Sequence, residues 1–539
     1  MNSVKKEVVV IGAGPAGLQL GYFFEKYSID YVILEKAEEA GAFFRQFPRH
    51  RKLISINKVH TGFEDKEINM RFDWNSLLSE EYEPLFKDLT KEYFPDADAF
   101  VEYLDNFRKK FSLKVEFNSN VEQISKVDDE FRIDLGNGKK YTCPNVVVAT
   151  GTSLPYLPEI NGIEHVVPYT ECSVDTKEFE NKRVLILGKG NSALETADHL
   201  IASASKIHVC SPNTVKMAWK THFVGHVRAV NNNFLDTYQL KSQNALIDGN
   251  IDLIEKLQDG TLAATIKYGN ADGEVEQLIY DAIIACTGFK FDASIFDDQV
   301  KPQLTIDDRF PDQNEKWESV NVKGLYFAGT ITQMRDFKKS TSGFVHGFRY
   351  NCECLFHILH KKIKGKDWPY SNVKAESKEM TNLIIQNINR TSALWQQFGF
   401  ICDAILIDGG EAKYLKSIPV DYLHKQARPN LDEYYTITLE YGNEIFEKAA
   451  NPFNISRVHR NDIKNANKSA FLHPIIRKIY KGRQVAEHHV IEDFENKWDE
   501  QPIHIQPLID FFEQHLLSDN RSDLLKNWKD SENMEKALV

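Results

Sequence analysis

Hydrophobic residues in this chain gather in short runs rich in β-branched residues, and two of these runs lead directly into glycine-rich turns. The two runs span 7–11 and 183–187, and each predicts a buried strand. A helix-like stretch and a second strand follow each turn, at 18–26 and 31–35 in the first case and at 194–202 and 207–210 in the second. The pattern therefore predicts two separate βαβ starts.

Three more apolar runs stop at a glycine, as buried strands do where they meet a ligand. They end at Thr150-Gly151, Thr287-Gly288 and Ala328-Gly329. The order of all these runs predicts an α/β fold with two Rossmann-like dinucleotide-binding domains, one inserted in the other. We expect the first domain to comprise residues 1–165 and 321–365, and the second to comprise residues 166–320.

The remaining residues, 366–539, contain no glycine-rich phosphate turn and are expected to form a C-terminal α+β accessory domain. The pattern predicts a helix over 376–398, a strand over 434–441 and a helix over 508–517. The last stretch, 518–539, is highly charged and is expected to fray. The sequence of this domain indicates no chemistry.

Composition and charge exclude several classes of function. Lys+Arg 66 and Asp+Glu 78 give a net charge of −12, and an acidic total disfavours broad, nonspecific nucleic-acid binding. No apolar run reaches the roughly 18 residues that a membrane-spanning helix needs, and the N-terminus lacks the apolar segment of a signal peptide. The 7 cysteines in so long a chain are not a disulfide framework, so reduced thiols and a cytoplasmic location are expected.

The first glycine-rich turn has the pattern Gly12-x-Gly14-x-x-Gly17 between a strand and a helix. In such a turn Gly12 allows the sharp bend, Gly14 lets the backbone approach a pyrophosphate, and Gly17 allows the helix to pack closely on the strand. Glu35 ends the next strand, where a carboxylate accepts hydrogen bonds from ribose hydroxyls. This context predicts a bound dinucleotide, and the alternative is a turn that serves packing alone.

The second turn, Gly-Lys-Gly-Asn-Ser-Ala at 188–193, repeats the pattern with alanine in the third place. The position equivalent to Glu35 is Ser211, and the missing carboxylate removes the repulsion that a ribose 2′-phosphate would meet. Lys216 and Lys220 follow and can pair with that phosphate. We therefore expect NADPH at this turn, with NADH still possible; the alternative for the lysines is an ordinary solvated surface.

Two dinucleotide sites in one chain imply a hydride relay, in which tightly held FAD at the first turn accepts a hydride from exchangeable NAD(P)H at the second. The candidate cofactor-binding residues lie in the two turns, at the strand ends and beside them: Gly12, Gly14, Pro15, Ala16, Gly17, Glu35, Lys36, Phe44, Val121, Thr150, Gly151, Gly188, Gly190, Asn191, Ser192, Ala193, Lys216, Thr287, Gly288, Gly329, Thr330 and Phe344.

Longer stretches resemble the flavin-containing monooxygenase superfamily over nearly the whole chain, and within it the FAD-dependent oxidoreductase domain-containing protein 2 type. They lie at 48–58, 73–78, 93–97, 187–193, 232–241, 343–350, 471–474 and 488–494. The resemblance implies a flavoprotein that uses FAD and NAD(P)H. It also implies that Asn57 lies beside the flavin, as a cofactor-binding and catalytic residue that helps hold the reduced and oxygenated forms. The alternative is that Asn57 serves a turn or a cap.

The resemblance further implies a monooxygenase that forms a C4a-hydroperoxyflavin with O2 and oxygenates a small-molecule substrate. The identifying motif of the superfamily departs here, because His165 stands three residues after Gly162 rather than four and Ile160 replaces an aromatic residue. The animal relatives work in the endoplasmic reticulum, whereas this chain shows neither an entry signal nor a KDEL-like tail, so a cytoplasmic relative is expected.

Other flavoprotein outcomes stay open. One is an NAD(P)H oxidase or reductase without oxygen transfer. Another is a disulfide reductase, for which Cys352 and Cys354 are the only closely spaced cysteines. A third is a redox-linked protein whose accessory domain binds a protein client.

Several polar residues carry two interpretations. Those between the second turn and its next strand either line a substrate pocket or form a surface excursion: His222, His226, Arg228, residues 231–233, Asp236 and Tyr238. Arg349, between His346 and Tyr350, pairs either with flavin or a substrate carboxylate or within a structural salt bridge. The spacing of His473, His488 and His489 predicts no metal site. Trp74 is expected in the core, and a homo-oligomer is left open.

Overall fold

The computed structural model describes residues 3–238, 244–408, 410–427, 433–442 and 451–516. By their internal contacts these residues divide into two compact units. Unit 1 comprises Met1–Val59 and Asp73–Arg349, and unit 2 comprises His60–Phe72 and Tyr350–Val539. The segment His60–Phe72 therefore interrupts unit 1 and is folded into unit 2. The predicted domain boundaries at 165/166, 320/321 and 365/366 stay a prediction.

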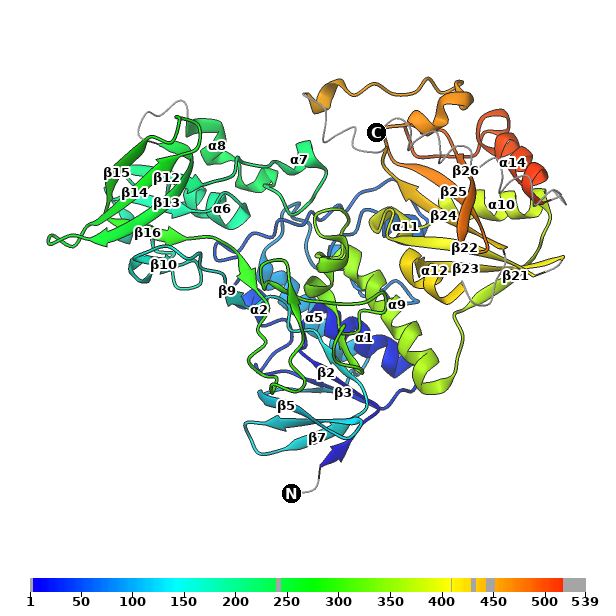
Figure 1. Cartoon of the computed structure of the whole chain (residues 1–539), viewed down its shortest axis with the longest axis horizontal. Helices are drawn as coiled ribbons and strands as arrows, with labels where there is room; N and C mark the ends of the chain where they lie inside the picture. The colour runs from blue at the N-terminus through cyan, green and yellow to red at the C-terminus, as the bar shows by residue number, and fades with distance from the viewer. Residues whose placement is uncertain (1–2, 239–243, 409, 428–432, 443–450, 517–539) are drawn as a thin grey trace. The chain divides into compact units, whose positions relative to one another are not determined.

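The first glycine-rich turn lies in a parallel five-stranded sheet of unit 1, with the order β20-β8-β2-β3-β4 (Figure 1). Its strands are β2 (Val8–Ile11), β3 (Tyr31–Leu34), β4 (Val115–Glu116), β8 (Val146–Val148) and β20 (Leu325–Phe327). β2 and β3 are buried throughout, as expected for a parallel sheet that is covered on both faces. Because the strands are parallel, the turns that follow β2, β8 and β20 meet at one edge.

The helix α1 (Pro15–Lys26) packs against β3 of this sheet, and α5 (Ala97–Lys110) packs against α1. Proline at the first position of α1 suits a helix start, since its missing N–H has no partner there anyway.

A second, mostly antiparallel sheet of unit 1 has the order β1-β7-β6-β5, from β1 (Val4–Lys5), β5 (Val121–Val127), β6 (Glu130–Leu135) and β7 (Lys140–Cys143). Residues of both sheets, including Ile11, Leu34, Ile124 and Phe131, share one hydrophobic core.

The second glycine-rich turn lies in a seven-stranded sheet with the order β10-β16-β11-β12-β13-β14-β15. The strands β10 (Val167–Pro168), β16 (Ala282–Ala285), β11 (Arg183–Leu187), β12 (Lys206–Ser211) and the start of β13 (Ala245–Lys256) run parallel. β14 (Leu262–Tyr268) and β15 (Val275–Tyr280) continue it antiparallel. The helix α6 (Asn191–Leu200) follows β11 directly, so this sheet repeats the strand–turn–helix arrangement of the first.

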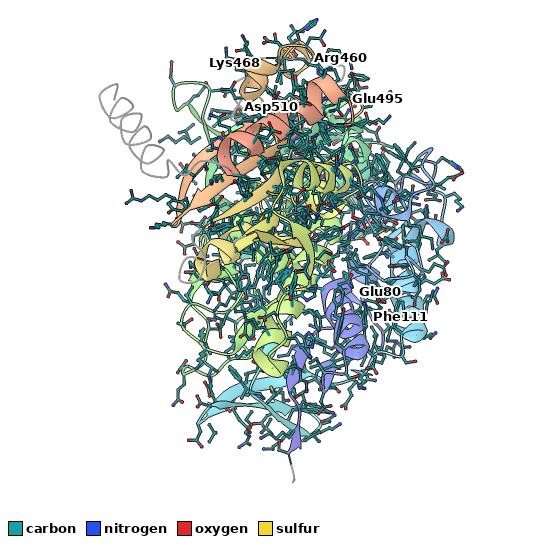
Figure 2. All side chains as sticks on the ribbon, turned by 90° about the vertical axis from the view of Figure 1, so that its right-hand side faces the viewer. Glu80, Phe111, Arg460, Lys468, Glu495 and Asp510 are labelled. Atoms are coloured by element: carbon teal, nitrogen blue, oxygen red, sulfur yellow. The ribbon has the colours of Figure 1, made fainter. Side chains whose placement is uncertain are left out.

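Unit 2 is built on an antiparallel sheet with the order β21-β23-β22-β24-β25-β26. Its strands are β21 (Tyr370–Lys374), β22 (Ile401–Asp408), β23 (Glu411–Pro419), β24 (Glu433–Glu440), β25 (His473–Tyr480) and β26 (Arg483–His489). Its helices include α9 (Val345–Lys364, which begins in unit 1), α10 (Ser377–Ile388), α11 (Ala393–Gln396), α12 (Val420–Ala427) and α14 (Gln506–Leu516). In α14, Leu508 and Phe512 are buried, whereas Asp510 belongs to the charged outer side chains that Figure 2 labels with Arg460, Lys468 and Glu495.

Shorter elements complete the two units. They are the antiparallel pair of β9 (Leu154–Pro155) with β17 (Phe289–Lys290), which are distant in the chain, and the hairpin of β18 (Leu304–Thr305) with β19 (Phe310–Pro311). The short helices are α2 (Phe43–Gln46), α3 (Lys66–Asn69), α4 (Phe86–Leu89), α7 (Ala218–Thr221) and α8 (Asn233–Thr237).

The predicted strand over 434–441 is confirmed as β24, and the helix over 508–517 as α14, of which residue 517 lies outside the described residues, as do residues 518–539. The prediction of one continuous helix over 376–398 is wrong, because the helix stops at Ile388 and resumes as α11. The guanidinium of Arg71 binds the carbonyls of Ile388 and Thr391, at 2.8 Å each. The carboxylate of Glu67 accepts the N–H of Ser392 at 2.7 Å. The segment His60–Phe72 thus satisfies the backbone groups that the break exposes.

Candidate functional site

The first glycine-rich turn leaves free space in front of α1. Gly12 has a φ of +104°, and a Cβ there would lie 2.8 Å from the carbonyl oxygen of Ala149. A Cβ on Gly17 would lie 2.0 Å from the carbonyl oxygen of Gly12, so both positions require glycine for packing. At Gly14, in contrast, no atom lies within 4 Å of a Cβ. This is the open cradle at a helix N-terminus that a pyrophosphate fits.

Glu35 stands beside this cradle, as predicted. Its carboxylate is buried and accepts the backbone N–H of Ala13 at 2.8 Å and that of Ala37 at 2.9 Å. It therefore closes the turn from the end of the neighbouring strand, and its role toward a ribose stays a prediction.

The second turn has the same geometry. Gly188 has a φ of +112°, and a Cβ there would lie 2.3 Å from the carbonyl oxygen of Cys286, whereas no atom lies within 4 Å of a Cβ on Gly190. Lys189 between them is buried, forms an ion pair with Asp248 and donates to the carbonyl of Ser211 at 3.2 Å. The residues of both turns thus fit a dinucleotide.

The side chain of Asn191 is used inside the protein. Its Nδ2 donates to the carbonyls of Gly225 and His226, at 3.1 and 3.0 Å. Its Oδ1 accepts the backbone N–H of Arg228 at 3.0 Å and Nδ2 of Asn231 at 3.1 Å. The predicted cofactor-binding residue therefore anchors the excursion after β12 to the start of α6.

Lys216, exposed after β12, belongs to a group of positive charges. The pKa of Lys338 is lowered by burial and by the charges of Lys216 and Arg309. Arg309 lies against Gly288, whose Cβ would stand 3.3 Å from Nη2 of the guanidinium. Lys216 and Arg309 therefore both act on the charge of Lys338, and together the three residues make this region positive.

Several predicted residues meet at the strand ends. Gly329, with a φ of +79°, approaches Ala16 of the first turn so closely that a Cβ would lie 2.8 Å from the Cβ of Ala16. Gly151 has a φ of +66°, and no atom lies within 4 Å of a Cβ built on it. Two other predicted residues make hydrogen bonds: Thr330 donates to the carbonyl of Gly343 and Thr287 to that of Tyr156. Three are packed inside the protein, since Phe44 contacts Phe100, Val121 lies in the core and Ala193 is buried. Pro15 and Ser192 lie in the first turns of α1 and α6, and Lys36 is exposed.

Asn57 is buried, and its Nδ2 donates to the carbonyls of Thr90 at 2.8 Å and Glu92 at 3.3 Å. Among the described residues its Oδ1 has no hydrogen-bond partner. The amide thus stabilises the loop before α5 and leaves one acceptor available. Its position beside the flavin stays a prediction.

Sequence reasoning missed a group of rings formed by residues from three distant segments. The rings of Trp74 and His346 are 4.6 Å apart, and that of Phe344 stacks on His346 at 5.7 Å. The guanidinium of Arg228 lies 5.0 Å from the ring centroid of Trp74, which is only partly buried rather than in the core. The sequence carries separate signals only: Phe344 is a predicted cofactor-binding residue, and Arg228 and His346 each stand in a polar run with two interpretations.

Comparison with known proteins agrees with this geometry. The model of the pyridine nucleotide-disulphide oxidoreductase family matches residues 9–329, which include both turns. The chain belongs to this family. This flavoprotein is also 35% identical to FAD-dependent oxidoreductase domain-containing protein 2 of Mus musculus, over 96% of this chain and 85% of the relative. The expected resemblance is therefore confirmed, and the chain is an FAD-dependent oxidoreductase.

Solved structures share the fold at low sequence identity. A flavin-containing monooxygenase from Stenotrophomonas maltophilia matches with a TM-score of 0.52 and 18% identity, over 67% of this chain and 99% of the other. A bacillithiol disulfide reductase from Staphylococcus aureus matches with a TM-score of 0.51 and 19% identity, over the same shares of 67% and 99%. The predicted fold of two Rossmann-like dinucleotide-binding regions, one interrupted by the other, is thereby confirmed.

Proposed function

We propose that this flavoprotein oxidises NADPH through bound FAD and uses O2 to oxygenate a small-molecule substrate. One observation carries the first part: both turns present an uncovered glycine, Gly14 and Gly190, at a helix N-terminus with no atom within 4 Å of a Cβ. Bound FAD supplies the electron transfer and the reaction with O2. The chain binds and orients both dinucleotides and excludes water from the reacting atoms.

The residues divide these tasks. The turn at Gly14 and the N-terminus of α1 hold the FAD pyrophosphate, and Glu35 accepts from its ribose. The N-terminus of α6 holds the nicotinamide dinucleotide, and the charges of Lys216, Lys338 and Arg309 favour a 2′-phosphate, which supports NADPH over NADH. Oδ1 of Asn57 is the acceptor that holds a proton donor in place on the flavin side.

Disulfide reduction is disfavoured by the state of the cysteines. All 7 are buried and unbridged. Cys354 donates to the carbonyl of Ser417 at 3.1 Å, and burial raises its pKa well above the ordinary value, which suppresses the thiolate that exchange requires. The same unbridged cysteines support the proposal of a cytoplasmic location. Among the described helices, none is long and apolar enough to cross a membrane.

The deciding experiment measures NADPH consumption, hydrogen peroxide and oxygenated product together, on purified protein loaded with FAD and supplied with candidate nucleophilic substrates. A monooxygenase forms oxygenated product and releases correspondingly less hydrogen peroxide per NADPH consumed. Peroxide equal to the NADPH consumed with every substrate identifies an NAD(P)H oxidase. An FAD-loaded protein that leaves NADPH unoxidised contradicts the proposed function as a whole.

A further inference from the structure

Arg228 carries a charge that the described chain does not neutralise. Its guanidinium is partly buried on the ring of Trp74, and no carboxylate among the described residues forms an ion pair with it. Arg108 and Arg183, also partly buried in unit 1, pair with Asp105 and Asp281 at 2.8 Å each, whereas Arg49 and Arg309 donate to backbone carbonyls. The guanidinium of Arg228 has neither kind of partner among the described residues. Burial lowers the pKa of Arg228. Buried charges in proteins are normally paired, so a missing anion is indicated.

The position of this guanidinium is set by the surrounding chain. The backbone N–H of Arg228 donates to Oδ1 of Asn191 at 3.0 Å, which fixes its loop to α6. Trp74 lies in a turn that Asp73 holds by accepting the N–H groups of Asn75 and Ser76 at 3.0 and 2.7 Å. Arginine stacked on an aromatic ring keeps its planar edge of N–H donors free for a carboxylate.

His346 supplies a second unsatisfied polar group beside the same ring. It is 2% exposed, and among the described residues its Nδ1 has no hydrogen-bond partner. Burial, together with the charges of Arg349 and Arg228, holds the pKa of His346 well below its ordinary value, so the imidazole is neutral. A neutral imidazole adds one hydrogen bond to a ligand without adding charge.

The group also adjoins the stretch that contains Asn57. Ser55 donates to Oδ1 of Asn75 at 2.6 Å, and Nδ2 of Asn75 donates to the carbonyl of Ile56 at 2.9 Å. Two hydrogen bonds therefore connect the turn of Trp74 to the stretch that is proposed to face the flavin.

We infer that Arg228, with Trp74 beneath it and His346 on the same ring, binds a carboxylate of the substrate. The inference rests on the proposed function and narrows its substrate to a small carboxylic acid with an apolar or aromatic body that the rings of Trp74 and Phe344 accommodate. The guanidinium holds the carboxylate through paired N–H donors and thereby orients the rest of the substrate.

A phosphate of the nicotinamide dinucleotide offers similar oxyanion chemistry, and the experiment separates the two sources. Ligand-observed NMR titrations of the full chain compare acetate, hexanoate and benzoate with their primary amides, and NADP+ is titrated in parallel. The variants are Arg228→Met, Arg228→Lys and, as a matched control, Arg108→Met, whose guanidinium also lies over a ring, at 5.4 Å from that of Phe117.

We expect at least one carboxylate to bind and its amide to fail. Arg228→Met should weaken carboxylate binding by about tenfold or more, Arg228→Lys less, and Arg108→Met should leave it unchanged. Absence of binding by every carboxylate, or equal binding to the parent and Arg228→Met, overturns the inference. A loss confined to NADP+ also overturns it and assigns the guanidinium to the nucleotide. Because binding is measured without turnover, a protein that binds carboxylates but leaves NADPH unoxidised contradicts the proposed function and not this site.

Discussion

The carboxylate of Glu35 accepts the backbone N–H of Ala13 at 2.8 Å and so ties the end of β3 to the turn that follows β2. Two neighbouring strands of a parallel sheet are thereby joined at the point where a dinucleotide lies across them. The residue shapes the turn, and we expect it to bind the ribose as well.

Glu35→Ala should lower the affinity for FAD by about tenfold or more, because the turn loses a charge-assisted hydrogen bond and the ribose loses its acceptor. Glu35→Gln keeps one carbonyl acceptor and should lose less. Titration of the apoprotein with FAD, followed by flavin fluorescence, gives the dissociation constants. Glu38→Ala, on an exposed neighbour, is the control. Parental affinity in Glu35→Ala would remove this residue from the site.

Gly14→Ala and Gly17→Ala should fail in different ways. A methyl group at Gly14 meets no protein atom within 4 Å, so the variant should fold but lose FAD, because the methyl occupies the pyrophosphate position. A methyl group at Gly17 would lie 2.0 Å from a carbonyl oxygen, so that variant should lose stability of the fold itself. Flavin absorbance and thermal unfolding separate the two effects. A fully yellow Gly14→Ala protein would falsify the assignment of the first turn.

Asn57→Ala should keep NADPH oxidation and release more peroxide per NADPH, because the acceptor that we propose beside the flavin is lost. The variant also leaves the carbonyls of Thr90 and Glu92 without their donor, which costs about 1–3 kcal/mol of stability. Asn57→Asp keeps an acceptor at this position and is the comparison. The ratio of peroxide to NADPH is the readout, and a ratio equal to the parent's in both variants excludes Asn57 from the reaction.

Lys216→Ala should raise the dissociation constant for NADPH by about tenfold and leave that for NADH unchanged, since only NADPH carries the 2′-phosphate that the positive group attracts. Lys220→Ala, also exposed on the same excursion, should have a smaller effect. Both constants are measured at low and high salt, because screening weakens the phosphate contact. An equal loss of affinity for NADPH and NADH would show that Lys216 does not bind the 2′-phosphate.

Glu195 on α6 should make stability depend on pH. Burial raises the pKa of its carboxyl from 4.5 to about 7, even though Tyr169 forms a hydrogen bond with it. A raised folded-state pKa stabilises the protein fully below pH 4.5, and that contribution is lost as the pH rises to about 7. The loss is roughly 3 kcal/mol. Denaturant unfolding between pH 4.5 and 7.5 should show this slope in the parent and not in Glu195→Gln; the same slope in both contradicts it.

The two turns could be predicted from sequence because a few neighbouring residues determine them: Gly12 and Gly188 need left-handed backbone, and Gly14 and Gly190 need an open approach. The interruption after Ile388 could not, since it depends on Arg71, 317 residues away in the chain. The contact of Arg228 with Trp74 likewise joins distant segments, and neither segment's own pattern predicts the other as its neighbour.

The path of the chain through His60–Phe72 has a consequence for how this protein can be divided. The polypeptide passes between the two units at residues 59/60, 72/73 and 349/350. A truncation after Arg349 would remove the carbonyls that bind the Arg71 guanidinium and leave that charge stranded on the shortened product. No single cut in the chain therefore separates the two units, because every cut leaves residues of both units on one of the two pieces.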